Sequence, residues 1–369
     1  GEVYPRRKTV AVGTLDITQK PGFVYRRIWG STWSGQNLWK VWNGAGGLPL
    51  STGHSWGGYV SREHFKEHPE WFPLGADGKR HPSQWLCTSN PELRTQFAGN
   101  VLKAIKAGAK YPSISPPDGV SYCQCPTCRA QDDPHSVEPT SGTICVTNRF
   151  VDFFDFIGSY VAKEAPDALL NFYCYADYTQ APTRKKKLAP NLCAWIAPIR
   201  YCRYHAIANA ACPSRMQLEE MIEDWSEVVS QIAYRTYTFN LAECSVPFSQ
   251  ISVWKHDIPY LKSQGCIGMN LESLHSWHIY GPHLYLAIRL SYEPDADADA
   301  VMDDYWLKMF GEKASVPMKA YWMEIDSAFK NMKCHTGCLS IRRNGSKSCA
   351  ACWTKPRRQP RAMSSMSAE

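Results

Sequence analysis

The sequence predicts a (β/α)₈ barrel, the TIM-barrel fold of the α/β class, over most of its length. Short apolar runs typical of β-strands recur eight times between residues 21 and 291, and longer stretches typical of helices separate them. Eight strands, each followed by a helix, are the number that closes such a barrel. The predicted strands are residues 23–25, 48–52, 84–87, 111–115, 169–175, 192–196, 234–239 and 266–271.

Polar side chains stand at the ends of several predicted strands. In chain order they are His54, Asp118, Asp177, Asn240 and Glu272. In a barrel of this kind, the loops after the carboxyl ends of the strands meet at one mouth, where the chemistry takes place. The sequence therefore predicts a functional site at this mouth.

Length and charge define the predicted domains. A chain of 369 residues is long enough for one barrel with extensions. We expect the barrel and its C-terminal helices to occupy residues 21–332, and residues 333–369 to be a disordered, basic tail rich in Cys and Ser. That tail holds eight Lys or Arg and one acidic residue, which accounts for the formal net charge of +7. Because the rest of the chain is neutral overall, we expect no nucleic-acid partner. No apolar run approaches the about 20 residues that span a membrane.

One group of cysteines is close together in the sequence. Cys123, Cys125 and Cys128 form a C-x-C-x₂-C cluster in the loop after the fourth predicted strand. Three thiolates can hold a metal with a fourth ligand such as His135. Alternatively, two of them pair as a disulfide, or all remain thiols. We expect no metal and no cofactor. The spacing also fits no common zinc ribbon or finger at the tail cysteines, which are Cys334, Cys338, Cys349 and Cys352.

Two carboxylates are the candidate catalytic residues. Asp118 follows the fourth strand, where Pro116 and Pro117 fix the backbone and Gly119 permits a sharp turn. Glu272 ends the eighth strand. Two carboxylates at one mouth are the minimum for glycoside cleavage, since one protonates the leaving oxygen and the other assists. The alternative is structural: Asp118 caps a turn, and Glu272 pairs with a nearby arginine.

Further residues at the same mouth are suited to binding a sugar. Sugars present apolar faces that stack on aromatic rings, and their hydroxyl groups need polar side chains beside those rings. Glu243, after the seventh strand, is the reserve carboxylate. The predicted substrate-binding residues are His54, Tyr175, Asn270, Trp277 and Glu243.

Motifs in a fixed order carry a family resemblance. Together they resemble the bacterial barrel family catalogued as domain of unknown function 4838, over roughly residues 20–330. The first seven residues resemble the end of the small α/β domain that precedes such barrels, as in α-glucuronidases, so residues 1–20 are expected to be its remnant. The motifs are His54-Ser-Trp, Glu67-His-Pro-Glu70-Trp-Phe-Pro-Leu, Leu86-Cys-Thr-Ser-Asn-Pro91, and Ser115-Pro-Pro-Asp118-Gly followed by the cysteine cluster.

The resemblance implies a glycoside hydrolase-like enzyme whose partner is an oligosaccharide or a larger glycan. Some family members resemble endo-β-N-acetylglucosaminidases that cut N-glycans. It also implies a secreted, periplasmic or cell-surface location. Two alternatives stay open. An exo-acting α-glucuronidase would need a cationic pocket for the substrate carboxylate, to which Arg26, Arg27 and Arg200 are possible contributors. A catalytically silent carbohydrate-binding barrel would keep the aromatic residues but lack two converging carboxylates.

Overall fold

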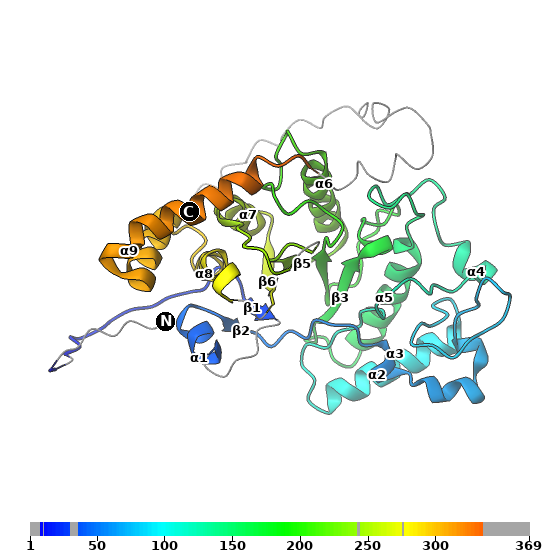
Figure 1. Cartoon of the computed structure of the whole chain (residues 1–369). Coiled ribbons are helices and arrows are strands. Elements are labelled where there is room, and N and C mark those ends of the chain that lie inside the picture. Colours follow the sequence, from blue (N-terminus) through cyan, green and yellow to red (C-terminus); the bar gives the residue numbers. More distant parts are fainter. Residues whose placement is uncertain (1–7, 10, 30–35, 242–243, 275–276, 335–369) are drawn as a thin grey trace, which may run out of the picture.

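The computed structural model describes residues 8–334, except residues 10, 30–35, 242–243 and 275–276. Its centre is a six-stranded sheet in the order β2-β1-β6-β5-β4-β3, with helices packed around it (Figure 1). Neighbouring strands are parallel, except that β1 and β2 are antiparallel. The strands are β1 (Tyr25–Trp29), β2 (Gly46–Gly47), β3 (Leu170–Tyr175), β4 (Leu192–Ala197), β5 (Gln231–Tyr237) and β6 (Cys266–Glu272).

The helices pack in neighbouring pairs around this sheet. Contacts join α3 to α5, α7 to α8, and α8 to α9. Among the described residues, none of the helices is long and apolar enough to cross a lipid bilayer. The helices are α1 (Gln36–Trp42), α2 (Trp56–Tyr59), α3 (Pro91–Lys106), α4 (Pro126–Arg129), α5 (Thr147–Ala162), α6 (Pro213–Val228), α7 (Ile251–Ser263), α8 (Trp277–Tyr292) and α9 (Ala298–Lys330), with the 3₁₀ turns η1 (Arg62–Lys66), η2 (Pro69–Trp71) and η3 (Ala176–Tyr178).

Local sequence explains where the longest helices begin. The Asn90 side chain accepts a hydrogen bond of 2.9 Å from the Leu93 N–H, and Pro91 occupies the first turn of α3. Asp297 caps α9 in the same way, accepting from the N–H groups at the helix start. Both caps satisfy backbone donors that have no partner inside the helix.

The structure confirms four of the predicted strands and shifts a fifth. Residues 169–175, 192–196, 234–239 and 266–271 correspond to β3, β4, β5 and β6, whereas the first predicted strand, residues 23–25, overlaps β1 only at Tyr25. β4 is buried along its whole length. Such continuous apolar runs are typical of parallel strands that are covered on both faces.

Three predicted strands are wrong as regular strands. Residues 48–52 and 84–87 are outside the sheet ladder, and residues 111–115 form only isolated bridges, Ser113 with Asn171 and His54 with Ser115. Proline contributes to this difference, because Pro49 and Pro112 have no N–H to donate to a ladder.

These irregular segments nevertheless lie beside the sheet. The Leu48 N–H donates to Val24 O at 2.8 Å, and the Ser51 N–H donates to Tyr111 O at 2.9 Å. The Ile114 N–H donates to Asn171 O at 2.7 Å. The segment 48–55 is therefore bonded on one side to the chain entering β1 and on the other to residues 111–115, which run beside β3.

Aromatic side chains fill the interior of the sheet. Trp195 of β4 is fully buried, and its Nε1 donates to Asn171 Oδ1 at 2.8 Å. Tyr25 of β1 packs edge-on against Trp195, with ring centroids 5.1 Å apart. The buried Asn171 amide in turn donates to Tyr111 O at 3.1 Å. This chain of contacts connects β1, β4, β3 and the 111–115 segment through the core.

A buried histidine in α8 makes folding sensitive to acid. His283 is fully buried beside Thr238 O, at 2.9 Å from Nε2, and burial lowers its pKa to about 4 from the ordinary 6.5. The unfolded chain therefore binds a proton below pH 6.5 that the folded chain binds only near pH 4. This contribution to stability is present above pH 6.5 and is lost as the pH falls toward 4.

We expect this single group to lower the free energy of unfolding by about 2 kcal/mol between pH 7 and pH 5. Urea titrations at the two pH values measure the difference. The variant His283→Gln should show a smaller loss between these pH values than the wild type. The control is His278→Gln, which changes an exposed side chain of the same helix and should leave the difference unchanged. An unaltered pH dependence in His283→Gln would contradict the assignment.

Candidate active site at the carboxyl ends of the strands

Most of the described residues predicted to form the site gather at one end of the sheet. Tyr175 is the last residue of β3, and Glu272 is the last residue of β6. The isolated bridge between His54 and Ser115 places His54 beside the segment that leads to Asp118. We define the strand-end cluster as His54, Asp118, Tyr173, Tyr175, Arg235, Asn270 and Glu272.

Glu272 is held by an arginine that the sequence analysis did not identify. The Arg235 Nε lies 3.0 Å from Glu272 Oε2, and Nη2 contacts the same oxygen. The two side chains are only 13% and 15% exposed. The guanidinium carbon lies 5.2 Å from the ring centroids of both Trp29 and Tyr173. An arginine enclosed by aromatic faces has few alternative rotamers, so it fixes the Glu272 carboxylate in one orientation.

Asp118 is placed very differently. Its side chain is 71% exposed, with Oδ1 4.0 Å from His54 Nε2. The same oxygen accepts the Gly119 N–H at 2.9 Å, and Gly119 has the φ of +94° that favours glycine. His54 Nδ1 is bonded to Pro116 O. Since a carbonyl oxygen only accepts, Nδ1 carries a hydrogen, and Nε2 is the nitrogen directed to Asp118.

Tyr175 lies within reach of both carboxylates. Its hydroxyl contacts the Asp118 side chain, and its pKa is raised to about 12 by burial and then by the negative charges of Asp118 and Glu272. The ring centroid is 6.0 Å from that of His54. Tyr175 is therefore a neutral hydroxyl donor at neutral pH, between an exposed carboxylate and one that is fixed by Arg235.

Asn270 is connected to the strand-end cluster by hydrogen bonds through Thr52. Its side chain is fully buried, and its Nδ2 donates to Thr52 Oγ1 at 2.9 Å. The Thr52 side chain in turn contacts the hydroxyl of Tyr173, which also receives a hydrogen bond from Arg235. Asn270, predicted to contact substrate directly, is thus placed to orient Tyr173 through Thr52.

Two predicted binding residues fall outside what the structure describes. Glu243 lies in the undescribed segment 242–243, and the side chain of Trp277 is likewise not described, although its backbone begins α8. Their predicted roles stay predictions.

The structural alternatives foreseen from the sequence are both observed. Asp118 does cap the turn at Gly119, and Glu272 does pair with an arginine. Neither contact removes the carboxylate from the strand-end cluster. An ion pair that fixes an anion at the end of a strand is compatible with a role in orienting or stabilising a substrate.

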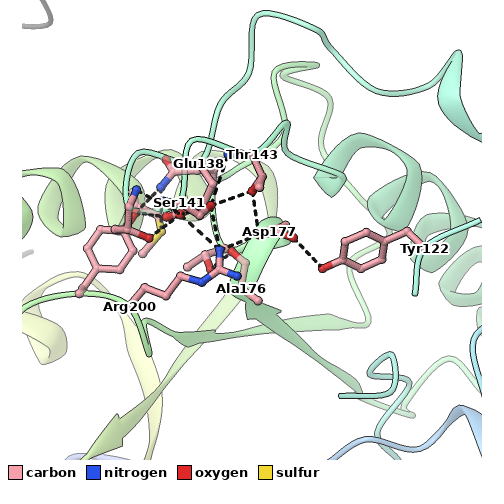
Figure 2. A network of polar contacts seen from close by, with 12 residues as sticks. Tyr122, Glu138, Ser141, Thr143, Ala176, Asp177 and Arg200 are labelled. Carbon is pink, nitrogen blue, oxygen red and sulfur yellow. Dashed lines mark hydrogen bonds and ion pairs between the residues drawn. The ribbon is translucent and has the colours of Figure 1, made fainter. Parts of the chain in front are cut away.

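A second acidic network lies beside the first, after β3 (Figure 2). Asp177 is 5% exposed and follows Ala176, whose φ of +50° is unusual for a residue with a side chain. Its Oδ1 accepts from Arg200 Nη1 at 2.6 Å and from Thr143 Oγ1 at 2.9 Å, and Oδ2 accepts from the Tyr122 hydroxyl at 3.2 Å. This strained turn is therefore stabilised by three polar contacts.

Glu138 completes this network and is fully buried. Its Oε2 accepts from the Ser141 N–H and hydroxyl, each at 2.9 Å, and lies 3.4 Å from Arg200 Nη1. Arg200 thus balances two carboxylates, Asp177 and Glu138, with its own side chain 31% exposed. The network fixes the loop around Ser141 to the end of β3. Sequence reasoning placed Asp177 at a strand end but missed Glu138, which lies far from Arg200 in the chain.

The described residues also contain groups with the chemistry of metal ligands. The sulfur atoms of Cys87, Cys123, Cys125 and Cys128 all lie within 4.8 Å of one another, and all four residues are buried. The fourth member of this group is Cys87, whereas His135, which the sequence suggested, is exposed.

A cavity of about 520 Å³ lies apart from the strand-end cluster. It is lined by residues 25–28 of β1 and by residues 40–41 and 45–51, including Arg27 and Lys40. None of the strand-end cluster residues lines this cavity.

Several solved glycoside hydrolases are similar to this chain at low sequence identity. A family 89 glycoside hydrolase from Clostridium perfringens, solved with its substrate GlcNAc-α-1,4-galactose, is 12% identical with a TM-score of 0.44 over 78% of this chain and 29% of that chain. A family GH115 4-O-methyl-α-glucuronidase is 10% identical with a TM-score of 0.40 over 65% of this chain and 30% of that one. An O-GlcNAc hydrolase from Thermobaculum terrenum is 10% identical with a TM-score of 0.39 over 67% of this chain and 50% of that one.

The family itself is defined by sequence. The model of the domain of unknown function DUF4838 matches residues 1–323, and the chain belongs to this family. The resemblance predicted from the motifs is thereby confirmed. No curated protein matches the chain. The chain spans less than a third of the length of the family 89 and GH115 enzymes.

Proposed function

We propose that this protein is a glycoside hydrolase-like enzyme that cleaves glycosidic bonds in a complex glycan at the strand-end cluster. The observation that carries the proposal is the position of Tyr175, whose hydroxyl contacts Asp118 within the field of Glu272. Two carboxylates from different segments thus meet around one aromatic hydroxyl, beside the rings of His54 and Tyr173.

The two carboxylates are suited to different tasks. Asp118 is exposed and 4.0 Å from His54, so it can exchange a proton with solvent and protonate a leaving oxygen. Glu272 is fixed as an anion by Arg235, which suits it to stabilising positive charge or orienting a polar substrate group. His54, Tyr175 and Trp277 would form the sugar subsite, with Glu243 as the reserve carboxylate.

The more specific proposal is an endo-β-N-acetylglucosaminidase. If the substrate carries an N-acetyl group, its own carbonyl oxygen can replace an enzyme nucleophile. One carboxylate then orients the amide while the other donates the proton. The fixed Glu272 and the accessible Asp118 match this division.

We also propose that the sheet closes into a barrel. The hydrogen bonds from Leu48 to Val24, from Ser51 to Tyr111 and from Ile114 to Asn171 support this closure. In such a ring, segments 48–55 and 111–115 stand between β1 and β3, and the cluster residues converge at one mouth. The proposed location is secreted, periplasmic or on the cell surface, where complex glycans occur.

The α-glucuronidase alternative has less support. It needs a cationic pocket, but the Arg26 guanidinium donates to Gly44 O and Phe23 O, each at 2.5 Å. Arg200 is paired with two carboxylates. Arg27 is exposed but lines the cavity that lies apart from the cluster.

A hydrolysis screen tests the proposal. Purified protein is incubated with N-glycans, aryl N-acetylglucosaminides and aryl glucuronides, and the released sugars are identified by mass spectrometry. Release of a glycan from an N-acetylglucosamine linkage is the expected result. Cleavage of glucuronides alone would favour the exo-acting alternative. Glycan binding without any cleavage would favour a silent carbohydrate-binding barrel.

A further inference from the structure

We propose that Cys87, Cys123, Cys125 and Cys128 together bind one zinc ion in a closed, four-sulfur structural site. Cys87 is the last residue of the predicted third strand, and the other three form the C-x-C-x₂-C cluster after Asp118. The proposal rests on the positions of these side chains and is independent of the proposed glycosidase activity.

The distances between the sulfur atoms match tetrahedral coordination. Four thiolates at about 2.3 Å from a tetrahedral zinc ion lie about 3.8 Å from one another. The Cys87 sulfur lies 3.7 Å from that of Cys125 and 3.8 Å from that of Cys128. One sulfur at similar distances from two others is expected when all share one ion, whereas a disulfide joins each sulfur to a single partner.

Hydrogen-bond donors surround the sulfur atoms. The Leu74 N–H donates to Cys123 Sγ at 3.3 Å, and the Cys128 N–H donates to Cys125 Sγ at 3.4 Å. The Ser89 hydroxyl lies 3.0 Å from Cys128 Sγ. Donors of this kind stabilise thiolates and orient metal ligands, and they have no comparable function around a disulfide.

Positive charge is also available beside the group. Four thiolates leave a net negative charge on a zinc site, and buried charge needs a partner. The Arg80 side chain contacts Cys87. Arg149 donates to Cys123 O at 2.7 Å and is paired with Asp132. Arg80 is therefore placed to balance the negative charge of the site, whereas the charge of Arg149 is already paired with Asp132.

The site would fix the loop that carries a candidate catalytic residue. Cys123 is only five residues beyond Asp118, and its neighbour Tyr122 donates to Asp177. A zinc ion would fix this loop to the segment around Cys87. The isolated bridges of residues 111–115 do not connect these two segments. All four positions are filled by protein, so the ion would have no open position for substrate.

Metal analysis of the full chain tests the proposal. Protein purified without added chelator is expected to contain zinc by mass spectrometry, and X-ray absorption should find sulfur about 2.3 Å from the metal. Cys87→Ser and Cys123→Ser should each lose about one zinc equivalent relative to the wild type. The matched control is Cys174→Ser, a fully buried cysteine in β3 outside the group, which should keep its zinc.

Other outcomes would overturn the proposal. One is that the wild-type protein contains no zinc and that its four thiols react only after reduction. That result would mean that these cysteines form disulfides. Another is Cys87→Ser with unchanged zinc content. The X-ray absorption spectrum of the wild type tests the proposal even if the serine variants do not fold. Cys87→His keeps a zinc ligand at this position, so it should bind zinc where Cys87→Ser does not.

We infer a second zinc site from a separate group, Cys202, His205 and Cys212. Their ligand atoms lie within 4.8 Å of one another, with Cys202 Sγ 3.2 Å from His205 Nδ1. All three residues are buried, and the Tyr204 N–H donates to Cys202 Sγ at 3.4 Å. The Cys334 side chain contacts both Cys202 and Cys212, and we propose it as the fourth ligand to this group of three. Three sulfurs and one imidazole are a common ligand set for structural zinc.

This second site would join the end of α9 to the start of α6. Cys212 immediately precedes α6, and Cys334 follows α9. Cys212→Ser is expected to remove about one zinc equivalent while the Cys87 group keeps its own. A double variant, Cys87→Ser with Cys212→Ser, should contain none. If Cys212→Ser keeps the wild-type zinc content, the second site is ruled out and the first is unaffected.

Discussion

Asp118→Asn and Glu272→Gln are each expected to lower the rate of glycan hydrolysis by roughly 10²–10⁴-fold, the usual range for losing acid–base assistance. The first change removes the proposed proton donor, a carboxylate that lies exposed beside His54. The second removes the anion that Arg235 holds at the end of β6. Binding should be nearly unchanged in both, because the rings of His54, Tyr173 and Tyr175 remain.

Steady-state kinetics on the best substrate of the screen, together with calorimetric binding, measure the two effects. Asp167→Asn is the control, since it changes an exposed carboxylate shortly before β3, away from the strand-end cluster. It should retain wild-type kcat. If Asp118→Asn and Glu272→Gln both hydrolyse glycans at wild-type rates, this pair is not catalytic, and Glu243 becomes the next residue to test.

Arg215→Met is expected to lower the free energy of unfolding by about 3–5 kcal/mol. Arg215 Nη2 lies 3.2 Å from Asp257 Oδ2, and the side chains are 3% and 0% exposed. Asp257 Oδ1 also accepts the Ile207 N–H at 2.8 Å. Methionine fills a similar volume but leaves the buried carboxylate without its positive partner, and this uncompensated charge is the source of the loss.

Urea unfolding at pH 7, at equal zinc content, measures the change. The control is Lys308→Met, because Lys308 and Asp304 form an exposed pair, with side chains 69% and 46% accessible. Exposed pairs contribute at most about 1 kcal/mol. A loss in Arg215→Met no greater than that of the control would show that Asp257 is stabilised by its other hydrogen bonds alone.

The strands that sequence reasoning found share one property. β3, β4 and β6 are buried on both faces, so their apolar runs are nearly continuous and easy to recognise. The segments 48–52 and 111–115 both contain proline; the first is held by single backbone hydrogen bonds and the second by isolated bridges. Their position beside the sheet depends on bonds to distant residues, which local composition does not encode. Residues 335–369, predicted to be a disordered tail, lie outside the described part of the chain.

The positions of the candidate residues could be predicted from the sequence where the order of the strands determines them. The contacts that depend on a partner distant in the chain could not. Strand ends meet at one edge, so Asp118 and Glu272 could be placed from the order of the strands. Arg235 is 37 residues from Glu272, and Cys87 is 38 residues from Cys125. The local sequence around each residue does not predict these partners, because only the folded chain brings them together. Cys87 was accordingly not predicted to join the cysteine cluster of residues 123–128.

The two carboxylates of the candidate site lie on backbone segments that differ in how many hydrogen bonds hold them to the sheet. Glu272 belongs to β6, which is hydrogen-bonded to β1 on one side and to β5 on the other. Asp118 follows a segment that touches its neighbours through isolated bridges. Local opening costs least where few backbone bonds must break. We therefore expect movement of the Asp118 side to change the spacing between the carboxylates. Under the proposed function, the Asp118 side would adjust to sugars of different width while Glu272 keeps its position.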